Sequence, residues 1–174
     1  MGLFDELTHP PAPDSLLTHS PKWAQWLAQQ QAQGITDKHE HMSLLFHDMA
    51  GDSDVVMPSP DVGSQAAHVQ AAMPALDSAQ RANYMLMAIA HNHPWHGYIS
   101  PGASPEFPRG GYAPGDPSSD DVNMARTAQI PSYVTNQSSV YRIGPDGHVA
   151  QWDLGKVLAA LNLTPGPYSG SPLR

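Results

Sequence analysis

Two histidines, His91 and His93, stand one residue apart at the end of an apolar segment of the 174-residue chain. If that segment is a strand, side chains at positions i and i+2 point to the same side, so both imidazoles can converge on one ion. A carboxylate from elsewhere in the chain would complete a set of three protein ligands. Zinc hydrolases use such open sites, in which the fourth position holds a water molecule. The spacing therefore predicts an open metal site.

The carboxylate that best completes this set is Asp121. It forms a Ser-x-x-Asp pattern with Ser118 at the start of a predicted helix. In an alternative register Ser118 only caps the helix and Asp120 is the ligand, and Asp116 is a weaker candidate. Imidazole and carboxylate ligands suit zinc, although ligand type alone does not fix the metal.

Hydrolysis of an amide also needs a base that takes a proton from water and passes it to the leaving amine. Glutamate is the usual residue for this task, and the chain has three: Glu6, Glu40 and Glu106. Glu6 lies in a proline-rich segment and Glu106 in a long segment rich in glycine and proline, whereas a predicted strand would hold Glu40 in place. Glu40 is therefore the predicted general base. Ser118 would donate a hydrogen bond to the developing oxyanion, a contribution worth about 2.7–4 kcal/mol.

Three elements must position these residues. Residues 84–90 form a short, continuous apolar run, and the asparagine, proline and glycine that follow favour a strand that ends in a loop. A helix is predicted over residues 117–129, with Ser118 as its N-cap and Asp121 as the capping-box partner. Alternating side chains predict a strand over residues 40–46.

A further helix is predicted before these elements. Ser20 fits the N-cap position and Pro21 the first helical position, where the missing N–H of proline has no intrahelical partner to lose. Trp23 and Trp26 share its apolar face. Gly34 predicts its end.

The whole pattern predicts an α/β fold, with a mixed central β-sheet flanked by helices. We expect an N-terminal arm and helix at 1–36, a metallohydrolase domain at 37–163 with a long loop at 95–117, and a flexible tail at 164–174. The other predicted elements are a strand at 55–57 stopped by the prolines at 58 and 60, a weak helix at 63–72, strands at 132–135, 140–143 and 148–152, and a helix at 153–161.

The run His91-Asn92-His93-Pro94, followed by Ser118-Ser119-Asp120-Asp121, resembles the JAMM motif of the JAB/MPN zinc metalloprotease family, in its bacterial branch. The family pattern is an upstream glutamate, His-x-His-Pro, a spacer and Ser-x-x-Asp. The resemblance covers about residues 37–147. It implies the family's cytidine-deaminase-like sandwich of sheet and helices.

Carried over by position, the resemblance implies that His91, His93 and Asp121 bind Zn²⁺. It implies that Glu40 is the catalytic acid and base, and that Ser118 stabilises the oxyanion. The reaction it implies is cleavage of a peptide or isopeptide amide bond, whereas the residues alone support only metal-assisted hydrolysis.

The spacer departs from the family pattern. The 23 residues 95–117 separate Pro94 from Ser118, far more than the family has there. Loop ends can be brought together at modest entropic cost, so we expect the site to form. The insertion would lie at the mouth of the cleft, where Trp95 and Tyr112 could grip a substrate or simply pack the loop on the domain.

The expected partner is a protein or peptide substrate. Bacterial relatives of this kind include accessory peptidases, phage-associated proteins and secretion-system effectors, and an effector would have an immunity or carrier protein as a partner. Two other functions fit the same residues: a non-catalytic metal-binding scaffold, and a module that binds a partner protein through the long loop. The intact set of Glu40, His91, His93, Ser118 and Asp121 favours the hydrolase, since a scaffold does not need it.

Composition limits the partners further. The chain has 8 Lys and Arg against 16 Asp and Glu, a net charge of −8, and no basic stripe, which argues against nucleic acid and against the metal-dependent nucleases that also carry His-Asn-His. The absence of cysteine excludes disulfides and cysteine-bound zinc. No long apolar run or secretory signal is present. We therefore expect no membrane partner, and a cytoplasmic protein or one exported without a Sec signal peptide.

Overall fold

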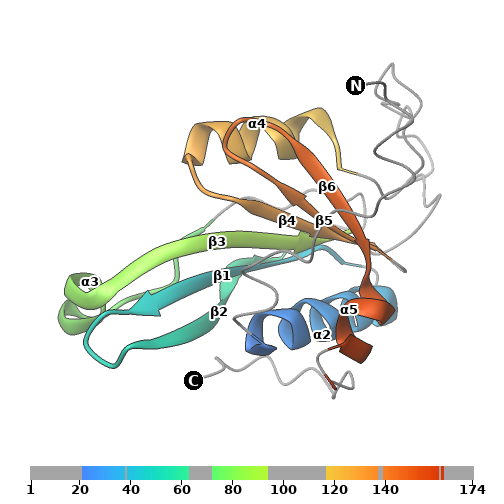
Figure 1. Ribbon diagram of the computed structural model, residues 1–174. Coiled ribbons are helices and arrows are strands. Elements are labelled where there is room, and N and C mark those ends of the chain that lie inside the picture. Colours follow the sequence, from blue (N-terminus) through green and yellow to red (C-terminus); the bar gives the residue numbers. More distant parts are fainter. Residues whose placement is uncertain are drawn as a thin grey trace.

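The fold is a single mixed sheet with helices on both faces (Figure 1). The computed structural model describes residues 21–37, 39–62, 72–93, 117–136, 139–160 and 162. Within these residues the six strands follow the order β2-β1-β3-β4-β5-β6 across the sheet. The predicted α/β fold with a mixed central sheet flanked by helices is confirmed.

All neighbouring strands are antiparallel except β3 and β4, which are parallel. A parallel pair needs a crossover connection, and helix α4 (Ser119–Ala128) lies on that connection. The C-terminal ends of β3 and β4 therefore lie next to each other at one end of the sheet, beside the start of β1. The strands are β1 (His41–Asp48), β2 (Ser53–Val62), β3 (Tyr84–Asn92), β4 (Ser132–Thr135), β5 (Ser139–Ile143) and β6 (Val149–Asp153).

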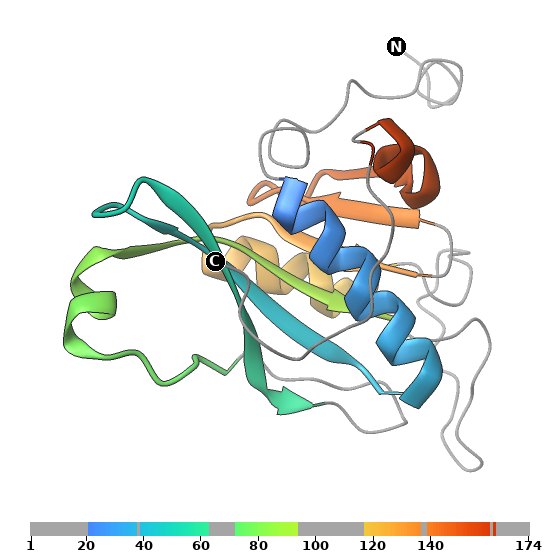
Figure 2. The same cartoon turned by 90° about the horizontal axis from the view of Figure 1, so that it is seen from below.

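Helices α2 (Pro21–Asp37) and α5 (Leu154–Ala160) cover one face of the sheet, and Figure 2 shows α2 lying across the strands. Helix α4 covers part of the other face. The side chains buried beneath α2 and α5 are Trp23, Ala24, Trp26, Leu27, Ala28, Leu45, Val56, Ala88, Ala90, Tyr133, Val140, Leu154 and Leu158. Because side chains alternate along β3, Ala88 and Ala90 face α2 while Ile89 and His91 face the side of α4.

Helix α2 is fixed by its tryptophans. Trp23 and Trp26 are fully buried, and the ring of Trp23 meets Tyr133 edge-on with ring centroids 5.7 Å apart. The predicted start at Pro21 is confirmed. The predicted end at Gly34 is wrong, because the helix continues to Asp37. A helical glycine costs only about 1 kcal/mol relative to alanine, and no proline follows to stop the helix.

The predicted stop of the second strand is also wrong. Strand β2 runs through Pro58 and Pro60 to Val62. It is the edge strand of the described sheet and has a neighbouring strand on one side only. Proline lacks an N–H, and at such an edge this need not remove a hydrogen bond between strands. Tolerance of proline in a strand depends on its place in the sheet, which the local sequence does not reveal.

The C-terminal elements follow the prediction closely. Strands β4, β5 and β6 and helix α5 each lie within one or two residues of the expected range. A turn precedes β6, in which the N–H of Gly147 donates to the carbonyl of Gly144 and Gly147 has a φ of 85° that favours glycine. A short helix that the sequence did not predict, α3 (Ser78–Asn83), precedes β3 and begins with a capping box formed by Asp77 and Gln80.

Several predictions fall on other parts of the chain. The N-terminal arm, most of the weak helix at 63–72, nearly all of the long loop at 95–117 and the tail at 164–174 lie outside the described residues. The division into an arm, a domain and a tail therefore stays a prediction. None of the described helices is long and apolar enough to cross a membrane.

Candidate metal centre

The C-terminal end of strand β3 places both histidines at the end of the sheet where β3 and β4 terminate. His91, the penultimate residue of the strand, is only 3% exposed. His93 follows the strand, and its backbone N–H donates to the carbonyl of Thr135 at 2.7 Å. The two Nε2 atoms lie 3.2 Å apart. The i, i+2 spacing therefore turns both imidazoles to the same side, as a strand end should.

Helix α4 contributes the carboxylate. Asp121 lies in its first turn and is buried, with Oδ1 2.9 Å from Nε2 of His91 and Oδ2 3.7 Å from Nε2 of His93. Ligands about 2.1 Å from a tetrahedral ion lie about 3.4 Å from one another. The observed separations bracket that value. The 23-residue spacer therefore does not keep the two halves of the motif apart.

His91, His93 and Asp121 form a group that could hold a metal ion. The alternative ligand Asp120 is exposed and lies outside this group. Asp116 lies outside the described residues. The Ser-x-x-Asp register is thus the one in which the carboxylate meets the histidines.

Ser118 holds Asp121 in place. As the N-cap of α4, it donates both its backbone N–H, at 2.5 Å, and its hydroxyl, at 2.9 Å, to Oδ2 of Asp121. The N–H of Asp121 donates back to the hydroxyl oxygen at 3.3 Å. The predicted capping box is confirmed. It leaves Oδ1 of Asp121 directed at His91, while the hydroxyl proton of Ser118 is engaged by Oδ2.

Glu40 lies beside the group without belonging to it. It immediately precedes β1, and its side chain is 5% exposed, with Oε1 3.8 Å from Nε2 of His93. It is not among the three residues that converge within ligand distance of one another. Its carboxylate therefore borders the group, and its role as the base stays a prediction.

The backbone that carries Glu40 is held by side-chain amides. Asn92 accepts a hydrogen bond from the N–H of His41 at 2.7 Å and donates one to the carbonyl of His39 at 3.1 Å. Gln30 of α2 donates to the carbonyl of His41. These bonds fix the peptide groups on both sides of Glu40.

A third side-chain amide, that of Gln31, supports the backbone of His93. Gln31 of α2 donates to the carbonyl of His93 at 3.3 Å and accepts from the hydroxyl of Thr135 at 3.1 Å. Sequence reasoning missed these contacts. A signal was available for the neighbouring contact of Gln30. This residue shares the helical face of Trp23 and Trp26 and is 0% exposed, and buried polar side chains need hydrogen-bond partners.

The buried charges determine the protonation of the metal-free group. Burial opposes the imidazolium of His91, but the negative charge and hydrogen bond of Asp121, with a smaller contribution from Glu40, outweigh it and raise the pKa of His91 to about 8. Burial likewise opposes the carboxylate of Asp121, yet the two histidines and Ser118 lower its pKa well below the usual value. A metal ion could replace the positive charge that the His91 proton supplies.

Comparison of the chain with family models, with curated proteins and with solved structures finds no match. What identifies the site is the convergence of side chains from three parts of the chain: strand β3, helix α4 and the residue before β1. Two imidazoles and one carboxylate could hold a metal ion. The donor set leaves the identity of that ion open.

Proposed function

We propose that the chain is a zinc-dependent hydrolase of the JAB/MPN kind, which cleaves a peptide or isopeptide amide bond. The observation that carries the proposal is the buried carboxylate of Glu40, 3.8 Å from His93 and outside the three-residue group. Structural zinc sites usually have four protein ligands, whereas catalytic sites have three and keep a position for water. Three ligands with a carboxylate beside them match the catalytic pattern.

In this proposal the metal ion and the protein side chains would carry out different parts of the hydrolysis. A bound zinc ion would acidify water and polarise the amide carbonyl. In this proposal Glu40 would accept a proton from a water beside His93 and return it to the leaving nitrogen, since a general base can act at hydrogen-bond distance from such a water. The two peptide groups that flank Glu40 are hydrogen-bonded, which favours a fixed position for the carboxylate.

Ser118 has two roles in this proposal. Its hydroxyl donates to Oδ2 of Asp121 and helps to orient that carboxylate. Its backbone N–H makes a second hydrogen bond to the same oxygen. The hydroxyl could therefore turn to the oxyanion of a substrate while the backbone N–H keeps Asp121 in place.

The substrate class comes from the motif. The resemblance to the bacterial branch of the family supports a protein or peptide substrate. In this proposal the chain would act as a secreted effector or as a phage-associated peptidase. The long insertion before Ser118 is a reason not to carry over a particular substrate.

Metal analysis and amidase assays on three matched variants test the proposal. Wild type should carry about one zinc per chain and hydrolyse an amide substrate. His93→Ala should lose both properties, and Glu40→Gln should keep the metal and lose the activity. His47→Ala, a substitution of a histidine in the distant β1–β2 hairpin, serves as the control and should change neither. A wild-type protein without stoichiometric metal would contradict the proposal.

A non-catalytic metal-binding scaffold is the second candidate. The observation in its favour is the buried pair of His91 and Asp121, whose Nε2 and Oδ1 atoms lie 2.9 Å apart, because such a pair could also serve to hold strand β3 and helix α4 together. The same variants separate the two functions. In a scaffold, His93→Ala would weaken metal binding, but Glu40→Gln would have no functional consequence.

A further inference from the structure

Asn92 is a buried residue between the two histidines, and it is not part of the metal group. It has 0% exposure. Strand alternation directs its side chain away from the side that His91 and His93 share. Both ends of its amide are engaged by backbone, the oxygen by the N–H of His41 and the nitrogen by the carbonyl of His39.

These two bonds connect β1 and β3 past the point where the backbone pairing of these two strands ends. The antiparallel pairing of β1 with β3 stops at the pair Met42 and His91. The segment with Glu40 lies just beyond that pair. This is the position at which the end of an ordinary strand would fray. There the amide of Asn92 bonds to the backbone of His39 and His41. Since its bonds reach the residues immediately before and after Glu40, they restrain the peptide planes on both sides of that carboxylate.

The contacts of α2 reinforce the same segment. Gln30, fully buried, donates to the carbonyl of His41. This is a third amide hydrogen bond to backbone within one residue of Glu40.

We propose that Asn92 is the positioning residue of Glu40: it fixes the carboxylate beside His93 by binding the two peptide groups that flank it. The inference rests on the proposed function, because it assumes that Glu40 acts on substrate. In this scheme the side chain of Asn92 bonds to the backbone of His39 and His41, and to neither the ligand side chains nor the reacting atoms. Its effect on turnover passes entirely through the backbone of residues 39–41.

Amide hydrogen exchange tests, without any activity assay, whether Asn92 restrains the backbone on both sides of Glu40. In Asn92→Ala the amide of His41 loses its acceptor and should exchange at least about tenfold faster than in wild type. Val140→Ala is the matched control, since Val140 is fully buried in the core cluster on the α2 and α5 face but lies on β5, two strands away from β3. It should raise exchange at His41 no more than its loss of global stability explains. An unchanged rate at His41 in Asn92→Ala would overturn the proposal.

A double-mutant cycle with Glu40 tests the consequence. Asn92→Ala should lower kcat by about 10- to 100-fold, as loss of a supporting contact does, with KM and zinc affinity unchanged. In the Glu40→Gln background, the same substitution should cause no further loss, because the group that it positions is already absent. A merely structural role would instead lower the residual rate by the same factor in both backgrounds.

Two further measurements keep the outcomes distinct. If Asn92→Ala does not fold, Asn92→Ser supplies a hydroxyl that can satisfy one of the two backbone partners, and intermediate values of exchange and kcat are expected. An Asn92→Ala variant with full kcat and a deprotected His41 amide would overturn the role of Asn92 alone. A zinc-loaded wild type that hydrolyses no amide would overturn the proposed function.

Discussion

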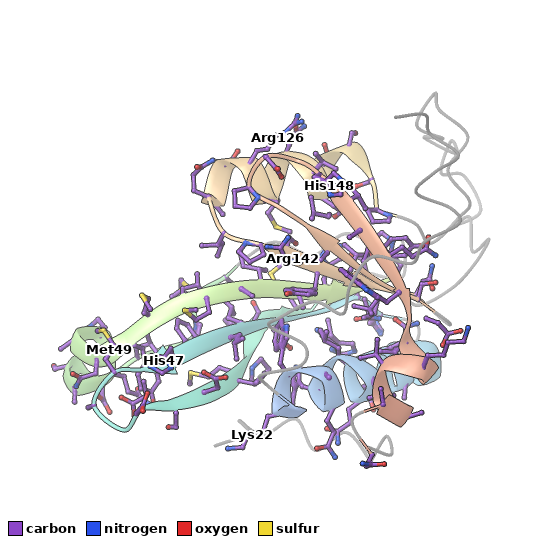
Figure 3. The ribbon with its side chains drawn as sticks, in the orientation of Figure 1. Lys22, His47, Met49, Arg126, Arg142 and His148 are labelled. Atoms are coloured by element: carbon purple, nitrogen blue, oxygen red, sulfur yellow. The ribbon has the colours of Figure 1, made fainter. Side chains whose placement is uncertain are left out.

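The two ends of the β1–β3 pair carry similar side chains in very different surroundings. At the end where β1 turns into β2, His47 lies 3.3 Å from Asp54 and 3.5 Å from Asp52, and its side chain is 29% exposed. Figure 3 shows His47 and Met49 at the tip of this hairpin, away from α2 and α4. Met49 and Met85 there are 56% and 46% exposed. At the other end, His91 and Asp121 are 2.9 Å apart and nearly buried.

The difference lies in how many elements meet. His47 and Asp54 are cross-strand partners within one hairpin, so their contact follows from local pairing and stays open to solvent. His91, Asp121 and Glu40 come from three separate parts of the chain and are brought together by the parallel pair and its crossover helix. Of the described residues, those at the second end form the group that could hold an ion. A histidine beside an aspartate becomes a candidate site only where a third ligand atom converges on the same point.

The largest expected contrast is in the loss of one carboxylate at each end. Asp121→Asn leaves His91 buried without its counter-charge and should lower the free energy of unfolding of the metal-free protein by about 3–5 kcal/mol. Asp54→Asn should change it by less than about 1 kcal/mol, because that pair is partly solvated. Denaturant titrations of the two variants measure both values. Equal effects would mean that burial does not separate the two ends.

The second contrast concerns pH. The pKa of His91 is raised to about 8 in the metal-free fold, above the ordinary value of the unfolded chain. Its contribution, about 2 kcal/mol for a shift of this size, is therefore complete below about pH 6.5 and is lost as the pH rises through 8. The lowered pKa of Asp121 acts in the opposite direction: its contribution is present above the ordinary carboxyl range and is lost as the pH falls.

The metal-free protein should accordingly be most stable between about pH 4 and 6.5, the window set by the ordinary pKa values of aspartate and histidine. Zinc binding requires neutral imidazole, so the loaded protein should not lose stability between pH 6.5 and 8, and zinc affinity should rise over that range. Thermal melts with and without a chelator measure the difference. In His91→Ala, the loss of stability above pH 6.5 should disappear; its persistence would assign the effect to another group.

The sequence was sufficient where the determinant is local. The i, i+2 histidines, the capping box of Ser118 and Asp121, and the tryptophan face of α2 follow from spacing over a few residues. It was insufficient where the determinant is tertiary. The edge position of β2 permits Pro58 and Pro60, and no local pattern encodes it.

The same limit applies to the supports of the site. Gln31 meets the carbonyl of His93 across 62 positions of sequence and Thr135 across 104. Asn92 stands inside the motif, yet its partners His39 and His41 are set by the strand pairing. Side-chain bonds to distant backbone carry no periodicity, so the residue types that converge could be predicted while the scaffold that aligns them could not.

The smallest contrast uses the two capping boxes, one at each end of the β3 region. Asp77 caps α3 with Gln80 as Ser118 caps α4 with Asp121. Ser118→Ala and Asp77→Ala should each lower the free energy of unfolding by about 1 kcal/mol, the usual contribution of an N-cap. Only Ser118→Ala also removes a hydrogen bond to Oδ2 of Asp121, and it should weaken zinc binding by about tenfold, as loss of such a supporting contact does.

Chelator competition on both variants measures zinc affinity, and denaturant titration checks that their stabilities match. If Asp77→Ala weakens zinc binding as much as Ser118→Ala does, the effect comes from general loosening of the fold, and the orientation of Asp121 is not what its cap controls. If only Ser118→Ala does so, the N-cap of α4 has a second function at the end of the sheet where the elements converge. The cap of α3 stabilises its helix alone, because no ligand follows it in the first turn.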